Sequence, residues 1–339
     1  ETVIQKTNSF SDCYARQMAC ESLRELEMTY PCLLAGFVED IFEDKELFDQ
    51  SMALPSLFKL CHAERSHTGQ SYTVLLLSIL EWILNGEQMN RLVLISGSSR
   101  GLGAAMAKSF SEAGYKVAIN YFKSEKAAKE LSQRLLGQSQ IFKCDVSCKN
   151  DVDAMLKNIK EEFGHHPSIL VNNAMTSYVF NGDDRKNAES ITWNEIQDHL
   201  NVTLKGSLNL IQGLIPDMKS ESFGRIINIG TNLVQNPVVP YHDYTVAKAA
   251  LLGLTRTFAK DLGPDGITVN MLSGGLLKVT DASSATPDFV FDAIAEMTPL
   301  QKVTTVEDFS DAALFFASDQ SRSITCLLYT SPSPRDLRK

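Results

Sequence analysis

The stretch Leu92-Val-Leu-Ile-Ser-Gly-Ser-Ser-Arg-Gly-Leu-Gly103 decides the fold. A short apolar run leads directly into a glycine-rich turn, and an alanine-rich helical pattern follows it. Glycines let the backbone turn sharply and approach a pyrophosphate, and the free N–H groups at a helix N-terminus favour an anion. Three glycines alone are weak evidence, because a plain turn also uses glycine. The order of strand, loop and helix favours a phosphate-binding loop.

Short apolar or β-branched runs alternate with helical patterns after this loop, as in βαβ units. The apolar runs are nearly continuous, which is expected for parallel strands covered by helices on both faces. We predict strands at residues 92–96, 116–120, 140–144, 169–172, 225–229 and 267–271. The expected fold class is α/β, with a doubly wound parallel sheet.

Residues 1–88 differ in character from the rest of the chain. They hold 14 acidic and 6 basic side chains, so they carry −8 of the net charge of −9. Apolar residues between Leu33 and Phe42 recur at i, i+3 and i+4, with acidic residues on the other face, which predicts an amphipathic helix. We expect a small acidic all-α segment of unknown function, which is either a fused module or a neighbouring sequence joined by error.

Composition excludes several classes of partner. An acidic chain without a Lys/Arg cluster lacks the electrostatic footprint of a nucleic-acid or anionic-membrane binder. No apolar run approaches the roughly 20 residues of a membrane-spanning helix, and no signal peptide is recognisable. Seven irregularly spaced cysteines favour a reducing compartment, and they fall at no recognised zinc-ligand spacing. We expect a cytoplasmic protein without a metal site.

Tyr244 and Lys248 form the strongest candidate for catalytic chemistry. They lie four residues apart at the start of an alanine- and leucine-rich helical pattern, so both side chains point to one face. The ordinary tyrosine pKa of about 10 is too high for proton exchange near neutrality, and an adjacent ammonium favours the phenolate. This spacing often arises by chance. Its position after a glycine loop and five predicted strands gives it weight.

These motifs, in this order, resemble the short-chain dehydrogenase/reductase family. The matching positions are the glycine spacing G-x-x-x-G-x-G from Gly97 to Gly103, the Asn-Asn-Ala turn after the fourth strand, and the Tyr-x-x-x-Lys pair. The resemblance covers residues 91–324 and is greatest to the 3-oxoacyl-acyl-carrier-protein reductase-like group. It implies a Rossmann-type NAD(P)-binding reductase domain at residues 89–325, preceded by the all-α segment.

The resemblance also implies roles for individual residues. Tyr244 would donate a proton, and Lys248 would lower its pKa and hold the ribose. Thr231, in place of the family's serine, would orient the carbonyl, with a local backbone bond as its alternative. Asn201 would continue a proton relay or would be an ordinary helix residue. The implied cofactor-binding residues are Gly97, Ser99, Arg100, Gly101, Leu102, Gly103, Asn120, Lys123, Asp145, Val146, Asn173, Ala174, Gly274 and Thr280.

Cofactor preference follows from charge at the end of the second strand. A carboxylate there would bind the adenosine ribose of NAD and repel a 2′-phosphate, but the sequence reads Asn120-Tyr121-Phe122. Arg100 and Lys123 offer cations to a phosphate instead, unless both are merely solvated. We predict that NADP(H) is preferred over NAD(H).

The expected function is the NADPH-dependent reduction of a carbonyl to an alcohol. The expected partner is a small-molecule carbonyl or acyl-thioester substrate, and the resemblance implies a homo-oligomer. Two departures from the family, Met175 for glycine and Ser273 for proline, together with Thr231, leave an alternative open. In that alternative the chain is an NADP-binding regulator or sensor with little turnover.

The family pattern stops at Thr325. Residues 326–339 do not continue it, and Pro332 and Pro334 cannot lie in a central strand. We interpret these residues as a non-native-looking tail, similar to translated adapter sequence, in place of the last strand. The sequence thus predicts that the last strand of the sheet is missing.

Overall fold

The computed structural model describes residues 91–181, 185–278, 280 and 283–331. The all-α segment predicted at residues 1–88 lies outside the described residues, and so does the end of the predicted tail. The description below concerns the described residues alone.

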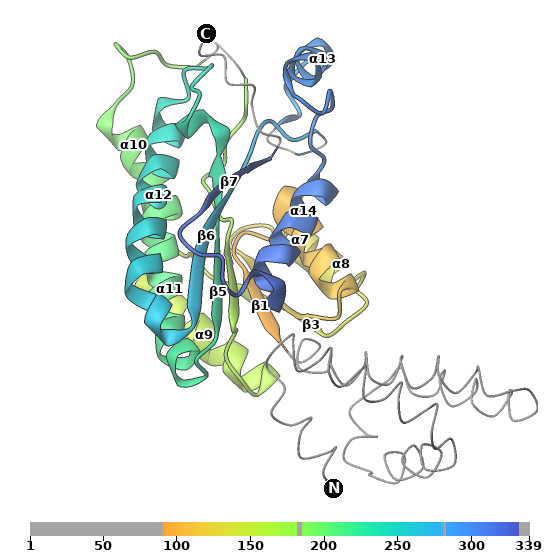
Figure 1. Ribbon diagram of the computed structural model, residues 1–339, viewed down its shortest axis with the longest axis vertical. Coiled ribbons are helices and arrows are strands. Elements are labelled where there is room, and N and C mark those ends of the chain that lie inside the picture. Colours follow the sequence, from red (N-terminus) through yellow and green to blue (C-terminus); the bar gives the residue numbers. More distant parts are fainter. Residues whose placement is uncertain (1–90, 182–184, 279, 281–282, 332–339) are drawn as a thin grey trace, which may run out of the picture. The chain divides into compact units, whose positions relative to one another are not determined.

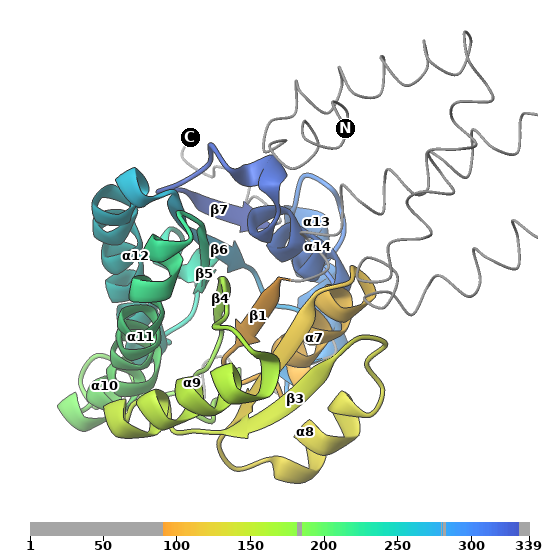
Figure 2. The ribbon, with the colours of Figure 1, turned by 90° about the horizontal axis from the view of Figure 1, so that it is seen from below.

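A parallel sheet of seven strands forms the centre of the domain, in the order β3-β2-β1-β4-β5-β6-β7 (Figures 1 and 2). The predicted doubly wound parallel sheet is confirmed, and each of the six predicted strands is present. Their bounds are β1 (Leu92–Ile95), β2 (Lys116–Tyr121), β3 (Ser139–Lys143), β4 (Ile169–Asn172), β5 (Gly224–Thr231) and β6 (Ile267–Gly274).

Helices cover both faces of the sheet. Figure 2 shows α9, α11 and α12 on one face and α7, α8 and α14 on the other. No helix among the described residues is long and apolar enough to cross a membrane. The bounds are α7 (Gly101–Glu112), α8 (Glu125–Ser132), α9 (Lys149–Phe163), α10 (Trp193–Leu200), α11 (Gly206–Ser220), α12 (His242–Leu262), α13 (Asp288–Met297) and α14 (Val306–Ala317).

Strand side chains alternate between two apolar cores. Leu94, Leu170 and Ile226 face α9 and α11, whereas their chain neighbours Val93 and Ile227 belong to the core under α7 and α14. Each fully buried aliphatic side chain stabilises the fold by about 1.5–3 kcal/mol relative to an exposed one. This two-sided burial explains why the sequences of the central strands β1 and β4 are almost entirely apolar.

The order in which strands are added to the sheet reverses between β1 and β4, which are neighbouring parallel strands. The carboxyl ends of all parallel strands lie on one edge, and open α/β sheets bind ligands outside that edge at the reversal. The glycine loop follows β1, and the Asn-Asn-Ala turn follows β4. The topology therefore brings the two motifs together.

The prediction that the last strand is missing is wrong. Residues Leu328–Ser331 form β7, which pairs in parallel with β6 from Met271 to Gly274. The backbone N–H of Met271 donates to the carbonyl of Leu327 at 2.8 Å. The strand is short, lies at the sheet edge and ends directly before Pro332, so neither proline has to enter the ladder.

Candidate active site

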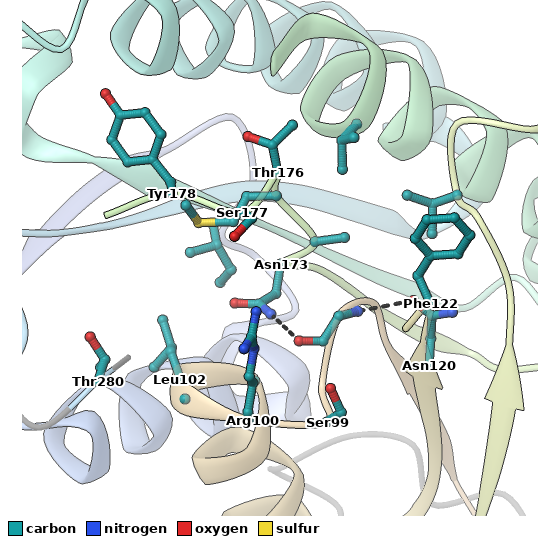
Figure 3. Close-up of a pocket in the computed structure, with 18 of the residues that line it drawn as sticks. Ser99, Arg100, Leu102, Asn120, Phe122, Asn173, Thr176, Ser177, Tyr178 and Thr280 are labelled. Carbon is teal, nitrogen blue, oxygen red and sulfur yellow. Dashed lines mark hydrogen bonds between the residues drawn. The ribbon is translucent and has the colours of Figure 1, made fainter. Parts of the chain in front are cut away.

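A cavity of about 490 Å³ opens at the carboxyl edge of the sheet (Figure 3). Tyr244 and Lys248 line it, as does every residue predicted to bind the cofactor: Gly97, Ser99, Arg100, Gly101, Leu102, Gly103, Asn120, Lys123, Asp145, Val146, Asn173, Ala174, Gly274 and Thr280. Within the described part of the chain, no group of three or more His, Cys, Asp or Glu side chains is placed to hold a metal ion.

Two asparagines hold the glycine loop in place. The Oδ1 of Asn120 accepts the backbone N–H of Gly97 at 2.9 Å, and the Nδ2 of Asn173 donates to the carbonyls of Ser96 and Gly97 at 3.0 Å (Figure 3). Asn120 is 2% exposed, and its Nδ2 donates to carbonyls at the end of β3. Asn120 lines the cavity as predicted, and its side chain holds the loop in place through the hydrogen bond with Gly97.

Ser96 is a supporting residue that the sequence did not reveal. Its Oγ accepts the backbone N–H groups of Asn173 at 2.9 Å and Ala174 at 3.0 Å, and it is 1% exposed. One buried hydroxyl therefore joins the end of β1 to the turn after β4. A serine at a strand end carries no sequence signal for this contact, since the partner is more than 70 residues away.

The loop leaves room for an anion at the start of α7. Gly97 and Gly101 have φ values of +62° and +56°, which favour glycine, and no side-chain hydrogen bond caps the first turn of α7. A Cβ atom on Gly103 would lie 2.6 Å from the carbonyl oxygen of Gly97. The helix and the loop are thus so close together that only a glycine fits at position 103. The free N–H groups in the first turn of the helix lie at the edge of the cavity.

Two exposed cations line the cavity. Arg100 belongs to the glycine loop and Lys123 follows β2, and the Nζ of Lys123 lies 5.5 Å from the Phe122 ring centroid. Figure 3 shows Arg100 extending from the start of α7 towards Asn173. Asp145, by contrast, uses its Oδ1 to accept the N–H and hydroxyl of Ser147.

Tyr244 and Lys248 lie in the first two turns of α12 and are both buried, at 7% and 2% exposure. The Nζ of Lys248 donates to the carbonyl of Ile229 at 2.6 Å and lies 5.7 Å from the Tyr244 ring centroid. Burial raises the pKa of Tyr244 to about 12, and a hydrogen bond with Thr231 opposes this rise. Burial lowers the pKa of Lys248 to about 8.

A side-chain hydrogen bond with Thr231 lowers the pKa of Tyr244, while the ammonium of Lys248 donates to the Ile229 carbonyl. The expectation that Lys248 lowers the pKa of Tyr244 stays a prediction. Thr231 also accepts the backbone N–H of Leu233 at 3.3 Å. The local bond, one of the two alternatives for Thr231, is therefore present, and orientation of a substrate carbonyl by Thr231 stays a prediction.

Thr231 and Asn201 are absent from the described residues that line the cavity. Thr231 is connected to the site by its hydrogen bond with Tyr244. Asn201 is the half-buried first residue of a π-helix at Asn201–Lys205. π-helices often occur at functional sites. A relay role for Asn201 stays a prediction.

An aromatic wall stands beside Tyr244, and the sequence did not single it out. Tyr178 and Phe180 line the cavity with ring centroids 5.4 Å and 5.5 Å from that of Tyr244. Met175, which replaces the family's glycine, lines the cavity as well and packs against the same cluster. The added methionine side chain thus narrows the part of the cavity next to Tyr244.

Comparison with known proteins agrees with this geometry. The sequence pattern of the family described as Enoyl-(Acyl carrier protein) reductase matches residues 97–328. The chain belongs to the short-chain dehydrogenase/reductase family. It is 33% identical over 241 residues to a 3-oxoacyl-[acyl-carrier-protein] reductase of Staphylococcus epidermidis, a match that covers 70% of this chain and 95% of that protein.

Two further relatives support this placement. An acetoacetyl-CoA reductase of Rhizobium meliloti is 32% identical over 240 residues, covering 70% of this chain and 95% of that protein. The crystal structure of a 3-oxoacyl-[acyl-carrier protein] reductase from Brucella melitensis with bound NAD superposes with a TM-score of 0.62. It is 28% identical, and the match covers 71% of this chain and 88% of that one.

As a short-chain dehydrogenase/reductase, the protein is an NAD(P)-dependent oxidoreductase. The residues present fit a dinucleotide. The positive-φ glycines and the uncapped start of α7 provide a pyrophosphate cradle, and the cavity continues from this cradle to Tyr244. Gly274 and Thr280 line the cavity after β6, where the family's nicotinamide contacts are expected.

Proposed function

We propose that this enzyme reduces a small-molecule ketone or 3-oxoacyl thioester to an alcohol with NADPH, and that Tyr244 is the proton donor. One observation supports this proposal above the others. A continuous cavity is lined at one end by the glycine loop and at the other by the buried pair of Tyr244 and Lys248. The names of the 3-oxoacyl- and acetoacetyl-thioester reductases that it resembles support the substrate class.

The glycine loop would hold NADPH, which would supply the hydride that the carbonyl carbon accepts. Tyr244 gives its hydroxyl proton to the carbonyl oxygen, and the hydrogen bond with Thr231 favours the phenolate that remains. Lys248, fixed by the Ile229 carbonyl, places a positive charge close to this phenolate. Asn201 is proposed to return a proton to the site.

The preference for NADPH is part of the proposal. Arg100 and Lys123 line the cavity as exposed cations that could bind a 2′-phosphate, and the end of β2 carries Asn120, whose side chain binds the loop. Cations attract the phosphate, and the missing carboxylate removes the repulsion that favours NAD. We also propose a cytoplasmic homo-oligomer, which membership of this family supports.

Replacing Arg100 or Lys123 with alanine tests the cofactor preference. A charge-assisted hydrogen bond contributes about 1.5–3 kcal/mol, so each variant is expected to raise the KM for NADPH by roughly 10- to 100-fold. The KM for NADH should stay within about twofold, since NADH lacks the phosphate. Steady-state kinetics with both cofactors measure this, with Lys126→Ala on the exposed face of α8 as control. Equal effects on both cofactors would refute the preference.

The rate of reduction is expected to depend on pH through Lys248. Tyr244, with its pKa raised to about 12, keeps its proton throughout the working range, whereas Lys248, with its pKa lowered to about 8, loses its charge above that pH. We therefore expect kcat/KM for reduction to be constant below about pH 7 and to fall tenfold per unit above about pH 8. A profile that stays flat to pH 10 would contradict this assignment.

A further inference from the structure

One buried carboxylate joins the aromatic wall to the helix that carries Tyr244. Asp243 is 4% exposed and precedes Tyr244 in the first turn of α12. Its Oδ1 accepts the hydroxyl of Tyr178 at 3.0 Å and the backbone N–H of Tyr244 at 2.9 Å. Its Oδ2 accepts the Nη2 of Arg185 at 3.0 Å. Asp243 therefore binds two side chains from the segment that follows β4, together with the backbone N–H of the residue next to it.

Tyr178 in turn lies against the ring of Tyr244. The two rings are stacked, with centroids 5.4 Å apart and planes 22° from parallel. The guanidinium carbon of Arg185 lies 4.0 Å from the Tyr178 ring centroid, a cation–π distance. Arg185 thus contacts both the ring of Tyr178 and the carboxylate that holds its hydroxyl.

The surroundings of Tyr178 leave its ring little freedom to turn. The ring of His199 meets it edge-on at 4.9 Å, and Phe180 meets it at 5.4 Å. His199 bonds to the Thr176 hydroxyl through Nε2 at 2.9 Å, which fixes the imidazole. Burial raises the pKa of Tyr178, so its hydroxyl remains a hydrogen-bond donor to Asp243.

We propose that Tyr178, Asp243 and Arg185 form a clamp that positions the Tyr244 ring for proton transfer. Tyr244 is the third residue of α12, and helix ends are the parts of a helix that fray most readily. A proton donor displaced by about 1 Å loses about a hundredfold in rate, so fixing this turn is worth a dedicated contact. The inference rests on the proposed function, in which Tyr244 is the proton donor.

Three variants separate the parts of the clamp. Asp243→Asn keeps the size of the side chain and one acceptor oxygen but removes the charge that holds Arg185. Tyr178→Leu removes the stacked ring, whereas Tyr178→Phe keeps the ring and loses only its hydroxyl bond. Asp153→Asn on α9 and Tyr329→Leu on β7 are matched controls at exposed positions.

Two measurements on the full chain test the clamp. The first is kcat for ketone reduction together with the Kd for NADPH. The second is the 19F NMR signal of Tyr244 in protein labelled with 3-fluorotyrosine, assigned by its loss in Tyr244→Phe. Asp243→Asn and Tyr178→Leu should each lower kcat at least about tenfold, leave the NADPH Kd within about twofold and shift the Tyr244 signal. Tyr178→Phe should have a smaller effect, and the controls should behave as the wild type.

The outcomes distinguish this inference from the proposed function. If kcat falls without a change in the Tyr244 signal, or the signal moves without a fall in kcat, positioning by the clamp is wrong. An unchanged kcat and an unchanged signal would overturn it too. If the wild type reduces no ketone or 3-oxoacyl thioester, the proposed function fails. The NMR experiment then still tests the clamp. A Tyr244 signal that does not change in Asp243→Asn and Tyr178→Leu would reject it, and a shifted signal would support it.

Discussion

Tyr244→Phe is expected to lower kcat for carbonyl reduction by about a thousandfold or more while the Kd for NADPH stays within about twofold. The substitution removes only the hydroxyl, and a positioned general acid contributes about 10²- to 10⁴-fold to a rate. The phenylalanine ring keeps its place against Tyr178 and in the apolar cluster around it. Cofactor fluorescence measures binding, and the loss of NADPH absorbance measures turnover.

Tyr329→Phe on the exposed part of β7 is the matched control for this variant. It removes a hydroxyl of the same kind from an exposed residue that does not line the cavity, so its kcat should equal that of the wild type. Undiminished turnover by Tyr244→Phe would refute the proton-donor assignment. Joint loss of turnover and NADPH binding would point to a disturbed cavity instead.

Gly103→Ala is expected to weaken NADPH binding by about a hundredfold, or about 2.7 kcal/mol. The added Cβ would lie 2.6 Å from the Gly97 carbonyl oxygen and 2.7 Å from the Nδ2 of Asn173. Backbone cannot yield as a flexible side-chain end can, so the loop must move away from α7. Overpacking of this kind also lowers the free energy of unfolding by about 1–3 kcal/mol.

Gly253→Ala supplies the control for Gly103→Ala. Gly253 lies within α12, and a Cβ there would meet no atom within 4 Å. Alanine is favoured over glycine in a helix by about 0.5–1 kcal/mol, so this variant should bind NADPH normally and unfold at a slightly higher temperature. If Gly103→Ala also binds NADPH as the wild type does, the glycine loop is not the pyrophosphate cradle.

The sequence predicted the elements whose signals are local. The central strands are predictable because they are short apolar runs buried on both faces, as Leu94 and Val93 illustrate, whereas the edge strand β3 is only partly buried. The seventh strand is not predictable from the same pattern, because the prolines of the tail argue against a strand although β7 ends before Pro332. An edge strand of four residues leaves little pattern to detect.

The residues of the candidate site also fall into two groups, those that the sequence predicts and those that only the fold reveals. Motif residues such as Gly103 and Lys248 were predictable because the chemistry dictates their spacing along the chain. Supporting contacts were not, since Ser96 meets Asn173 and Tyr178 meets Asp243 only after folding, the latter pair across 65 positions. The lowered pKa of Lys248 could not be predicted from the sequence either, because it results from burial of the side chain in the fold.

Transfer of deuterium from NADPH deuterated at the transferable C4 position is the most direct test of the central claim. The full chain is incubated with this cofactor and a panel of ketones and 3-oxoacyl thioesters, and the alcohol products are analysed by mass spectrometry. Carbonyl reduction at this site predicts one deuterium per product molecule on the carbinol carbon, in the wild type and not in Tyr244→Phe. Tight NADPH binding without any deuterated alcohol would contradict the enzyme function and favour a cofactor-binding sensor.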